Sequence, residues 1–174
     1  MPGEPTGTIV LADTSVLVNL AIVDRLDLLG ALAGFDFRVP EEVVEEVRRP
    51  EQRELLDRAL RAGHLDRSRL SGVPVLDHYR ELRHDLGPGE AACLALAYAE
   101  GWSVACDEKR FFRREARRLL GEGRLLNTPG LFVLGIRQRY WTVSEADQAK
   151  EVLERNRFRM RFRSFDELVR SKGS

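Results

Sequence analysis

Short apolar runs, separated by longer segments with a helical period, organise this sequence. Four runs predict buried strands at residues 8–13, 35–39, 102–106 and 124–127. In the segments between them apolar residues recur every three or four positions, which is typical of amphipathic helices. We expect helices at about 14–23, 24–33, 40–49, 51–62, 76–84, 90–100, 109–120, 129–139 and 144–155. Short strands that alternate with helices predict an α/β fold, with a parallel sheet covered on both faces.

Two segments do not follow these periods. Residues 64–75 form the least regular stretch, for which we expect mostly loop. Every odd residue from 155 to 163 is Arg, so in an extended chain the arginines project from one face and Phe158, Met160 and Phe162 from the other. We expect the apolar face to pack on the core. For the arginines we favour a structural or partner-binding role over RNA binding.

Polar residues near the C-terminus predict two helix starts. A Ser144/Asp147 pair opens the helix expected at 144–155. The segment Ser164-Phe-Asp-Glu167 predicts the cap of a short last helix.

The length of 174 residues suits a single domain with a sizeable core. We expect a disordered head at 1–7, the main domain at 8–140, and a basic extension at 141–174 that packs on the same domain. The start lacks a basic and apolar export signal, and no apolar stretch is long enough to cross a bilayer, so we expect a cytoplasmic protein. Cys93 and Cys106 stand in apolar surroundings and are expected to be buried free thiols.

The net charge is zero, but two parts of the chain carry opposite charges. Residues 1–108 hold 20 acidic and 11 basic residues, a balance of −9, and residues 109–174 hold 8 and 17, a balance of +9. An acidic site beside a basic surface suits a metal-dependent enzyme that acts on a polyanion. Helices of opposite charge that attract each other within the protein would give the same composition. Composition therefore does not favour the enzyme over this alternative.

Four acidic residues stand next to apolar segments. Asp13 and Asp107 follow predicted strands, Glu46 lies among valines, and Glu90 opens an Ala/Leu-rich helix. Carboxylates in apolar surroundings are costly to keep charged, and several together provide the oxygen ligands that a hard divalent cation prefers. Because the carboxyl ends of parallel strands share one rim, we expect Asp13 and Asp107 there. Taken singly, Glu90 is better explained as a helix cap, and Asp107 is equally well explained as a turn residue.

Five motifs, in order, resemble those of PIN domains. They are Ile9-Val-Leu-Ala-Asp13-Thr14-Ser15-Val-Leu-Val-Asn19-Leu, Pro40-x-x-Val43-x-x-Glu46-Val47, Leu86-Gly-Pro-Gly89-Glu90-Ala-Ala-Cys-Leu-Ala-Leu-Ala97, Ala105-Cys106-Asp107-Glu108-Lys109 followed by Arg114 and Ala116, and Asn127-Thr128-Pro-Gly130-Leu-Phe-Val-Leu134. Each motif alone is weak, but five in sequence are specific. Asn127 stands where the family usually has Gly. Glu46 is favoured over Glu45 as the second acid because it directly precedes Val47.

The resemblance implies a three-layer α/β/α fold with a central parallel sheet, and a Mg²⁺- or Mn²⁺-dependent ribonuclease in the domain at 8–140. Many bacterial members are VapC-like toxins of toxin–antitoxin pairs, so RNA is the expected substrate and a small antitoxin the expected partner. A homodimer is compatible with this interpretation. The residues implied are Asp13, Glu46, Glu90 and Asp107 as catalytic acids, Asp13, Glu90, Asp107 and Glu108 as metal ligands, and Thr14, Ser15 and Thr128 as residues that support them.

The helix expected at 109–120 carries arginines at three- and four-residue steps along one side. Because this helix follows directly on Asp107, we expect its arginines to bind RNA, although a solvated helix face has the same pattern. The residues expected to bind RNA are Arg110, Arg113, Arg114 and Arg117.

Two rival functions can be weighed from the sequence. A non-catalytic PIN-like module that binds RNA or protein is disfavoured because acids stand in all four acidic motifs. A phosphatase of the haloacid dehalogenase type needs a second Asp two residues after Asp13, where Ser15 stands. A zinc site is disfavoured too, because neither the cysteines nor the histidines have the necessary spacing.

Overall fold

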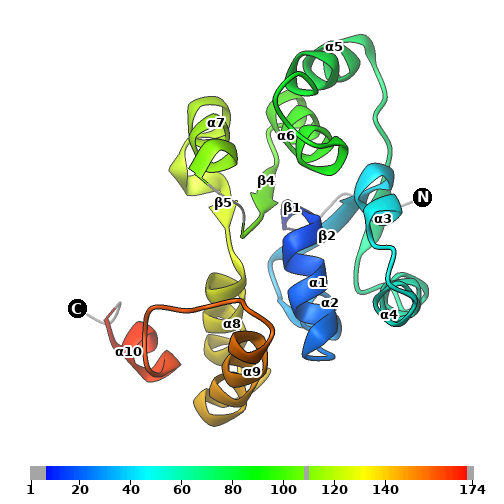
Figure 1. Ribbon diagram of the computed structural model, residues 1–174. Coiled ribbons are helices and arrows are strands. Elements are labelled where there is room, and N and C mark those ends of the chain that lie inside the picture. Colours follow the sequence, from blue (N-terminus) through cyan, green and yellow to red (C-terminus); the bar gives the residue numbers. More distant parts are fainter. Residues whose placement is uncertain (1–6, 108–109, 172–174) are drawn as a thin grey trace.

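The computed structural model describes residues 7–107 and 110–171 and is built around a parallel sheet (Figure 1). Its strands are β1 (Thr8–Ala12), β2 (Phe35–Pro40), β3 (Asp66–Ser68), β4 (Ser103–Ala105) and β5 (Leu125–Leu126). They lie in the order β3-β2-β1-β4-β5, and every neighbouring pair is parallel. The predicted α/β fold with a central parallel sheet is therefore confirmed.

Helices cover both faces of the sheet. They are α1 (Thr14–Ile22), α2 (Asp27–Ala31), α3 (Glu41–Glu46), α4 (Pro50–Arg61), α5 (Val73–Leu82), α6 (Pro88–Glu100), α7 (Arg110–Leu120), α8 (Thr128–Arg137), α9 (Val143–Arg155) and α10 (Phe165–Arg170). In Figure 1, α5, α6 and α7 lie on one side of the strands, and α1, α2, α8 and α9 lie on the other. These are the three layers of an α/β/α fold.

The central strand explains the continuous apolar run at the start of the chain. In β1, Val10, Leu11 and Ala12 are fully buried, because helices pack on both faces of the strand. β1 pairs with β2 through Val10 and Phe37, and with β4 through Leu11 and Val104. All these strands run in one direction, so the residues that follow them lie on one rim of the sheet.

The structure corrects two predictions. The segment 64–75 contains the strand β3, which pairs with β2 at the edge of the sheet. Its residues are polar and largely exposed, so no apolar pattern marks them. Helix α9 is capped by Thr142 and Glu145, which form a reciprocal capping box, and the predicted Ser144/Asp147 cap is wrong. The Asp147 carboxylate instead accepts hydrogen bonds from the Ser164 hydroxyl and the Phe165 amide.

Two further expectations concern the ends of the chain and the membrane. The disordered head was expected at 1–7, and residues 1–6 lie outside the described residues. Within the described part of the chain, no helix has the length and apolar character needed to span a bilayer.

The packing of α8 against its neighbours can be tested at Gly135. A Cβ at Gly135 would lie 2.8 Å from Trp141 Nε1 and 2.9 Å from Leu28 Cδ1. We expect Gly135→Ala to destabilise the protein by about 1–3 kcal/mol, because both neighbours must move. Gly123→Ala is the matched control, since its Cβ meets nothing within 4 Å. Urea unfolding of both variants checks this, and equal stabilities would contradict it.

Candidate active site

Two of the predicted acids lie side by side on the rim of the sheet. The Asp13 amide, directly after β1, donates to the Ala105 carbonyl at 3.0 Å at the end of β4. Asp107 follows two residues later. The Asp13 side chain is buried, with 2% of its surface exposed. Residues far apart in the sequence therefore meet here because β1 and β4 are parallel neighbours.

The hydroxyl of Ser15 joins these two acids. Ser15 Oγ accepts a hydrogen bond from the Asp107 amide at 3.0 Å and donates to Asp13 Oδ2 at 3.2 Å. Ser15 lies in the first turn of α1, directly after the end of β1. One side chain thus fixes the backbone that carries Asp107 and orients the Asp13 carboxylate.

The preceding residue of α1 holds the third acid. Thr14 Oγ1 donates to Glu46 Oε2 at 2.6 Å, and the Gly89 amide donates to Glu46 Oε1 at 2.7 Å. Glu46 ends α3, whereas Glu45 is exposed and makes no such contact. A Cβ at Gly89 would lie 2.7 Å from Glu46 Oε2, so this approach requires glycine.

The Asp107 carboxylate is held by three donors. The Thr128 amide donates to Oδ1 at 2.8 Å, the Thr128 hydroxyl donates to Oδ2, and Asn19 Nδ2 donates to Oδ2 at 3.0 Å. Burial raises the pKa of the Asp107 carboxyl above its usual value, while the hydrogen bonds from Thr128 and Asn19 and the charge of Arg113 lower it. Thr128 is fully buried at the start of α8. The Asn127 side chain caps that helix by accepting from the Gly130 amide at 2.8 Å.

A buried thiol shows that the negative charges converge. Burial raises the pKa of Cys93 well above its usual value, and the charges of Asp13, Glu46 and Glu42, together with Cys106, raise it further. Cys93 lies on α6, which packs against β1 and β4. The Asp13 carboxylate, directly after β1, and the acids of α3 therefore all affect this thiol.

Sequence reasoning gave no role to two residues at this site, Asn19, which stands in the first motif, and Glu42. Asn19 interrupts the apolar face of α1, one turn after Ser15, and its amide reaches Asp107. Glu42 lies one helical turn before Glu46 on α3, and its Oε2 is buried without a hydrogen-bond partner among the described residues. Each lies four residues from a predicted site residue, Asn19 from Ser15 and Glu42 from Glu46. This spacing places both members of a pair on one face of a helix and was the signal in the sequence.

The remaining predicted acids are placed as follows. Glu90 is partly buried in the first turn of α6, directly after Gly89. Glu108 lies outside the described residues. Among residues 7–107 and 110–171, no three His, Cys, Asp or Glu side chains are close enough to enclose one ion. The carboxylates are instead neighbours linked through hydroxyl and amide groups.

This donor set fits a hard divalent cation. It consists of carboxylate and hydroxyl oxygens, and no ion pair between described residues joins Glu46 or Asp107 to a lysine or arginine. Mg²⁺ keeps several of its waters and is usually bound through only one or two carboxylates. A site of neighbouring acids without a closed cage suits that behaviour.

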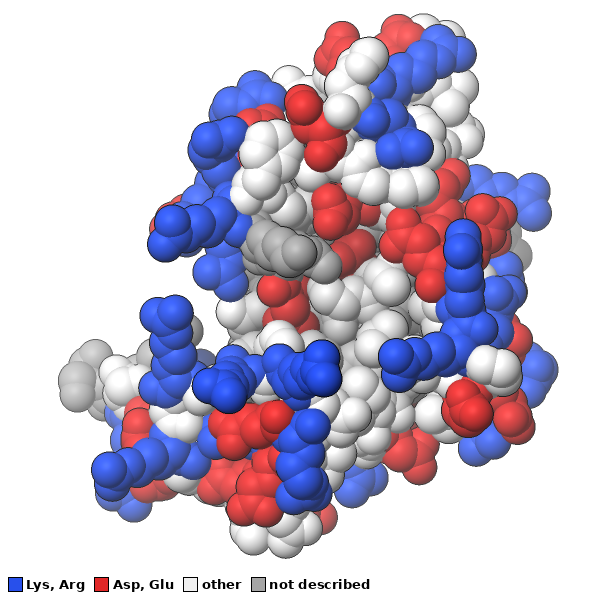
Figure 2. Space-filling model, viewed as in Figure 1, with Lys and Arg blue, Asp and Glu red and all other residues white. Residues whose placement is uncertain are grey.

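The arginines predicted to bind RNA lie on the helix that follows Asp107 in the sequence. Arg110, Arg113, Arg114 and Arg117 are exposed on α7, and the charge of Arg113 acts on Asp107. Figure 2 shows acidic side chains in a central hollow, with cationic side chains over α7 along its upper left side. Negative and positive surfaces thus adjoin on one face.

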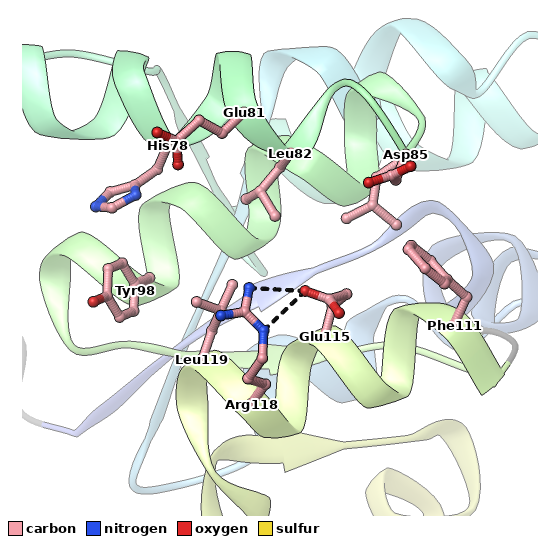
Figure 3. Close-up of a pocket in the computed structure, with 10 residues that line it drawn as sticks. His78, Glu81, Leu82, Asp85, Tyr98, Phe111, Glu115, Arg118 and Leu119 are labelled. Atoms are coloured by element: carbon pink, nitrogen blue, oxygen red, sulfur yellow. Dashed lines mark hydrogen bonds and ion pairs between the residues drawn. The ribbon is translucent and has the colours of Figure 1, made fainter.

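A separate pocket lies between α5, α6 and α7 (Figure 3). Arg118 and Glu115 form an ion pair of 2.9 Å across its floor, and His78 packs edge-on against Tyr98. None of the predicted catalytic acids lines this pocket. The candidate active site is therefore the rim of the sheet and not this pocket.

Comparison with known protein families agrees with the fold. The sequence profile of DUF3368, described as a PIN domain, matches residues 9–173, so the chain belongs to this PIN-domain family. Among solved structures, VapBC2 from Rickettsia felis, bound to a DNA fragment from its promoter, is similar with 20% identity and a TM-score of 0.48. The match covers 69% of this chain and 98% of that chain, and a likeness at this level carries no argument about function. No curated protein matches the chain.

The hydrogen bond from Thr14 to Glu46 can be tested by changing one atom. Thr14→Val keeps the shape of the side chain but removes the donor, so we expect a loss of about 1.5–3 kcal/mol, typical of a hydrogen bond to a charged group. Thr14→Ser keeps the hydroxyl and is the matched control. Urea unfolding measures both, and a valine variant as stable as the serine variant would show that the bond contributes nothing.

Proposed function

We propose that this protein is a metal-dependent endoribonuclease and the toxin of a toxin–antitoxin pair. The observation that carries the proposal is the hydroxyl network of the first turn of α1. Through Thr14 and Ser15 it gathers Asp13, Glu46 and Asp107 on the carboxyl rim of the sheet. Membership of a PIN-domain family supports the same activity.

Asp13, Glu90 and Asp107 are the acids proposed to bind Mg²⁺ or Mn²⁺, one or two of them directly and the others through the waters that the ion keeps, with Glu108 and Glu46 as further acids. A bound ion would supply an activated water for in-line attack on a phosphodiester and would stabilise the leaving oxygen. The oxygen-only donor set supports this choice of metal over zinc.

The protein itself orients the acids. Burial raises the pKa of the Asp107 carboxyl, and the donors Thr128 and Asn19 offset part of this increase. Ser15 sets the direction of the Asp13 carboxylate. Thr14 does the same for Glu46, so each acid has its own hydroxyl donor.

The substrate side of the proposal rests on α7. Its proposed RNA-binding arginines stand next to the acids, where they would bind the phosphates that flank the cleaved bond. Arg113 is the nearest to the chemistry, since its charge acts on Asp107. A small antitoxin encoded beside the protein is the proposed partner, as for the VapC-like toxins that the sequence resembles.

The Asp13→Asn variant tests the activity. We expect it to lose metal-dependent RNA cleavage while its melting temperature stays the same or rises, because one of several mutually repelling buried charges is removed. Asp77→Asn, at an exposed acid on α5, is the matched control and should cleave like the wild type. Cleavage of labelled RNA with Mg²⁺ or Mn²⁺ measures this, and an active Asp13→Asn protein would remove Asp13 from the site.

The metal is tested separately through stability. An ion that binds only the folded state stabilises it by about 2.7 kcal/mol at a concentration of about one hundred times its dissociation constant. We expect Mg²⁺ or Mn²⁺ to raise the melting temperature of the wild type and of Asp77→Asn. The Asp13→Asn/Asp107→Asn double variant should lose this response. An equal shift in the double variant would mean that the ion binds elsewhere.

A further inference from the structure

The segment between α9 and α10 carries a row of exposed arginines on an apolar base. Met160 is buried with 8% of its surface exposed, and Phe158 and Phe162 are partly buried. The arginines between and beside them are exposed, as the alternation in the sequence predicts. We call Arg157, Arg159, Arg161 and Arg163 the arginine strip.

The base of the strip is fixed to the helices below it. The Phe162 ring packs against Phe165 at 4.9 Å, and Phe165 packs against Phe132 of α8 at 5.4 Å. Lys150 of α9 lies 5.6 Å above the Phe162 ring. Asp147 binds the Ser164 hydroxyl at 2.6 Å and so fixes the end of the segment. The apolar residues therefore anchor the segment to the helices, and the arginines are available to bind a ligand.

The strip lies on the same face as the candidate active site. α8 begins at Thr128, which holds Asp107, and one turn later presents Phe132 to the C-terminal segment. Figure 2 shows cationic side chains over this segment below the acidic hollow, while those of α7 lie above it. The hollow thus has a cationic border on two sides.

The charge of the strip is not used inside the protein. Ion pairs between described residues involve Arg114, Arg117, Arg118, Lys150 and Arg170 in this half of the chain, but none of the four strip arginines. The charge of Arg159 acts on Glu154, which is already bound to Lys150 at 2.8 Å. Four exposed guanidinium groups in one short segment repel each other, and a polyanion would relieve this repulsion.

We infer that the arginine strip is a second phosphate-binding surface, which holds the RNA strand on the side of the hollow opposite α7. The inference rests on the proposed function and extends it. The substrate would be an RNA long enough to reach from α7 across the acids to the strip. RNA fits better than an acidic protein segment, because the strip and α7 border the same hollow and a polyanion that enters it passes both.

Binding measurements test the strip without relying on catalysis. The full-length Asp13→Asn protein is combined with Arg157→Gln/Arg161→Gln/Arg163→Gln, and the affinity for a long unstructured RNA is measured at several salt concentrations. We expect weaker binding, and a slope of log affinity against log salt that flattens by about 2, since each lost phosphate contact on a single strand removes roughly 0.7. The matched control is Arg58→Gln/Arg61→Gln/Arg80→Gln on α4 and α5, which should leave both quantities unchanged.

Each outcome decides the inference. Equal affinities and slopes for the strip and control variants, with equal melting temperatures, would overturn it. So would unchanged RNA binding together with lost binding of a polyglutamate peptide, which would assign the strip to an acidic protein segment. Cleavage by the wild type is measured in parallel. If no RNA is cleaved but the strip variant still loses affinity, the proposed nuclease fails while the RNA-binding strip stands.

Discussion

Two neighbouring hydroxyl groups hold the candidate active site together. Thr14 and Ser15 begin α1 and reach carboxylates or amides from β1, from α3 and from the loop after β4. Buried carboxylates repel each other and lose hydration, so they stay charged only where donors are fixed in advance. The first turn of a helix that emerges from the central strand is a rigid place for such donors.

The neighbouring strands and helices bring the acids and their donors close to the first turn of α1. β1 lies between β2 and β4, so α3 and the Asp107 loop, which follow those strands, both come within reach of α1. α6 supplies the Gly89 amide, and its lack of a side chain lets Glu46 approach. α8 supplies both donors of Thr128. A shift of α6 or α8 would therefore alter a hydrogen bond to one of the acids directly.

The sequence predicted those features that leave a clear pattern of apolar and polar residues. Asp13 was predictable because the buried strand β1 gives an apolar run that ends at a polar residue. β3 was not, because an exposed edge strand of three residues has no apolar pattern. The α9 cap was misplaced because Ser144 and Thr142 are both good caps, although Glu145, three residues after Thr142, completes a capping box that is already visible in the sequence. No role could be assigned to Asn19 because its partner, Asp107, is distant in sequence.

The charge asymmetry of the chain has a structural explanation that composition could not give. Opposite charges of the two halves act on each other in places, as Arg113 does on Asp107, but without forming ion pairs between described residues. Each ion pair between two described residues instead lies within one half. Asp13, Glu46 and Asp107 lie at the rim of the sheet, and cationic side chains over α7 and the strip border the acidic hollow on two sides (Figure 2). On this face cations would neutralise the acids, and phosphates would neutralise the arginines.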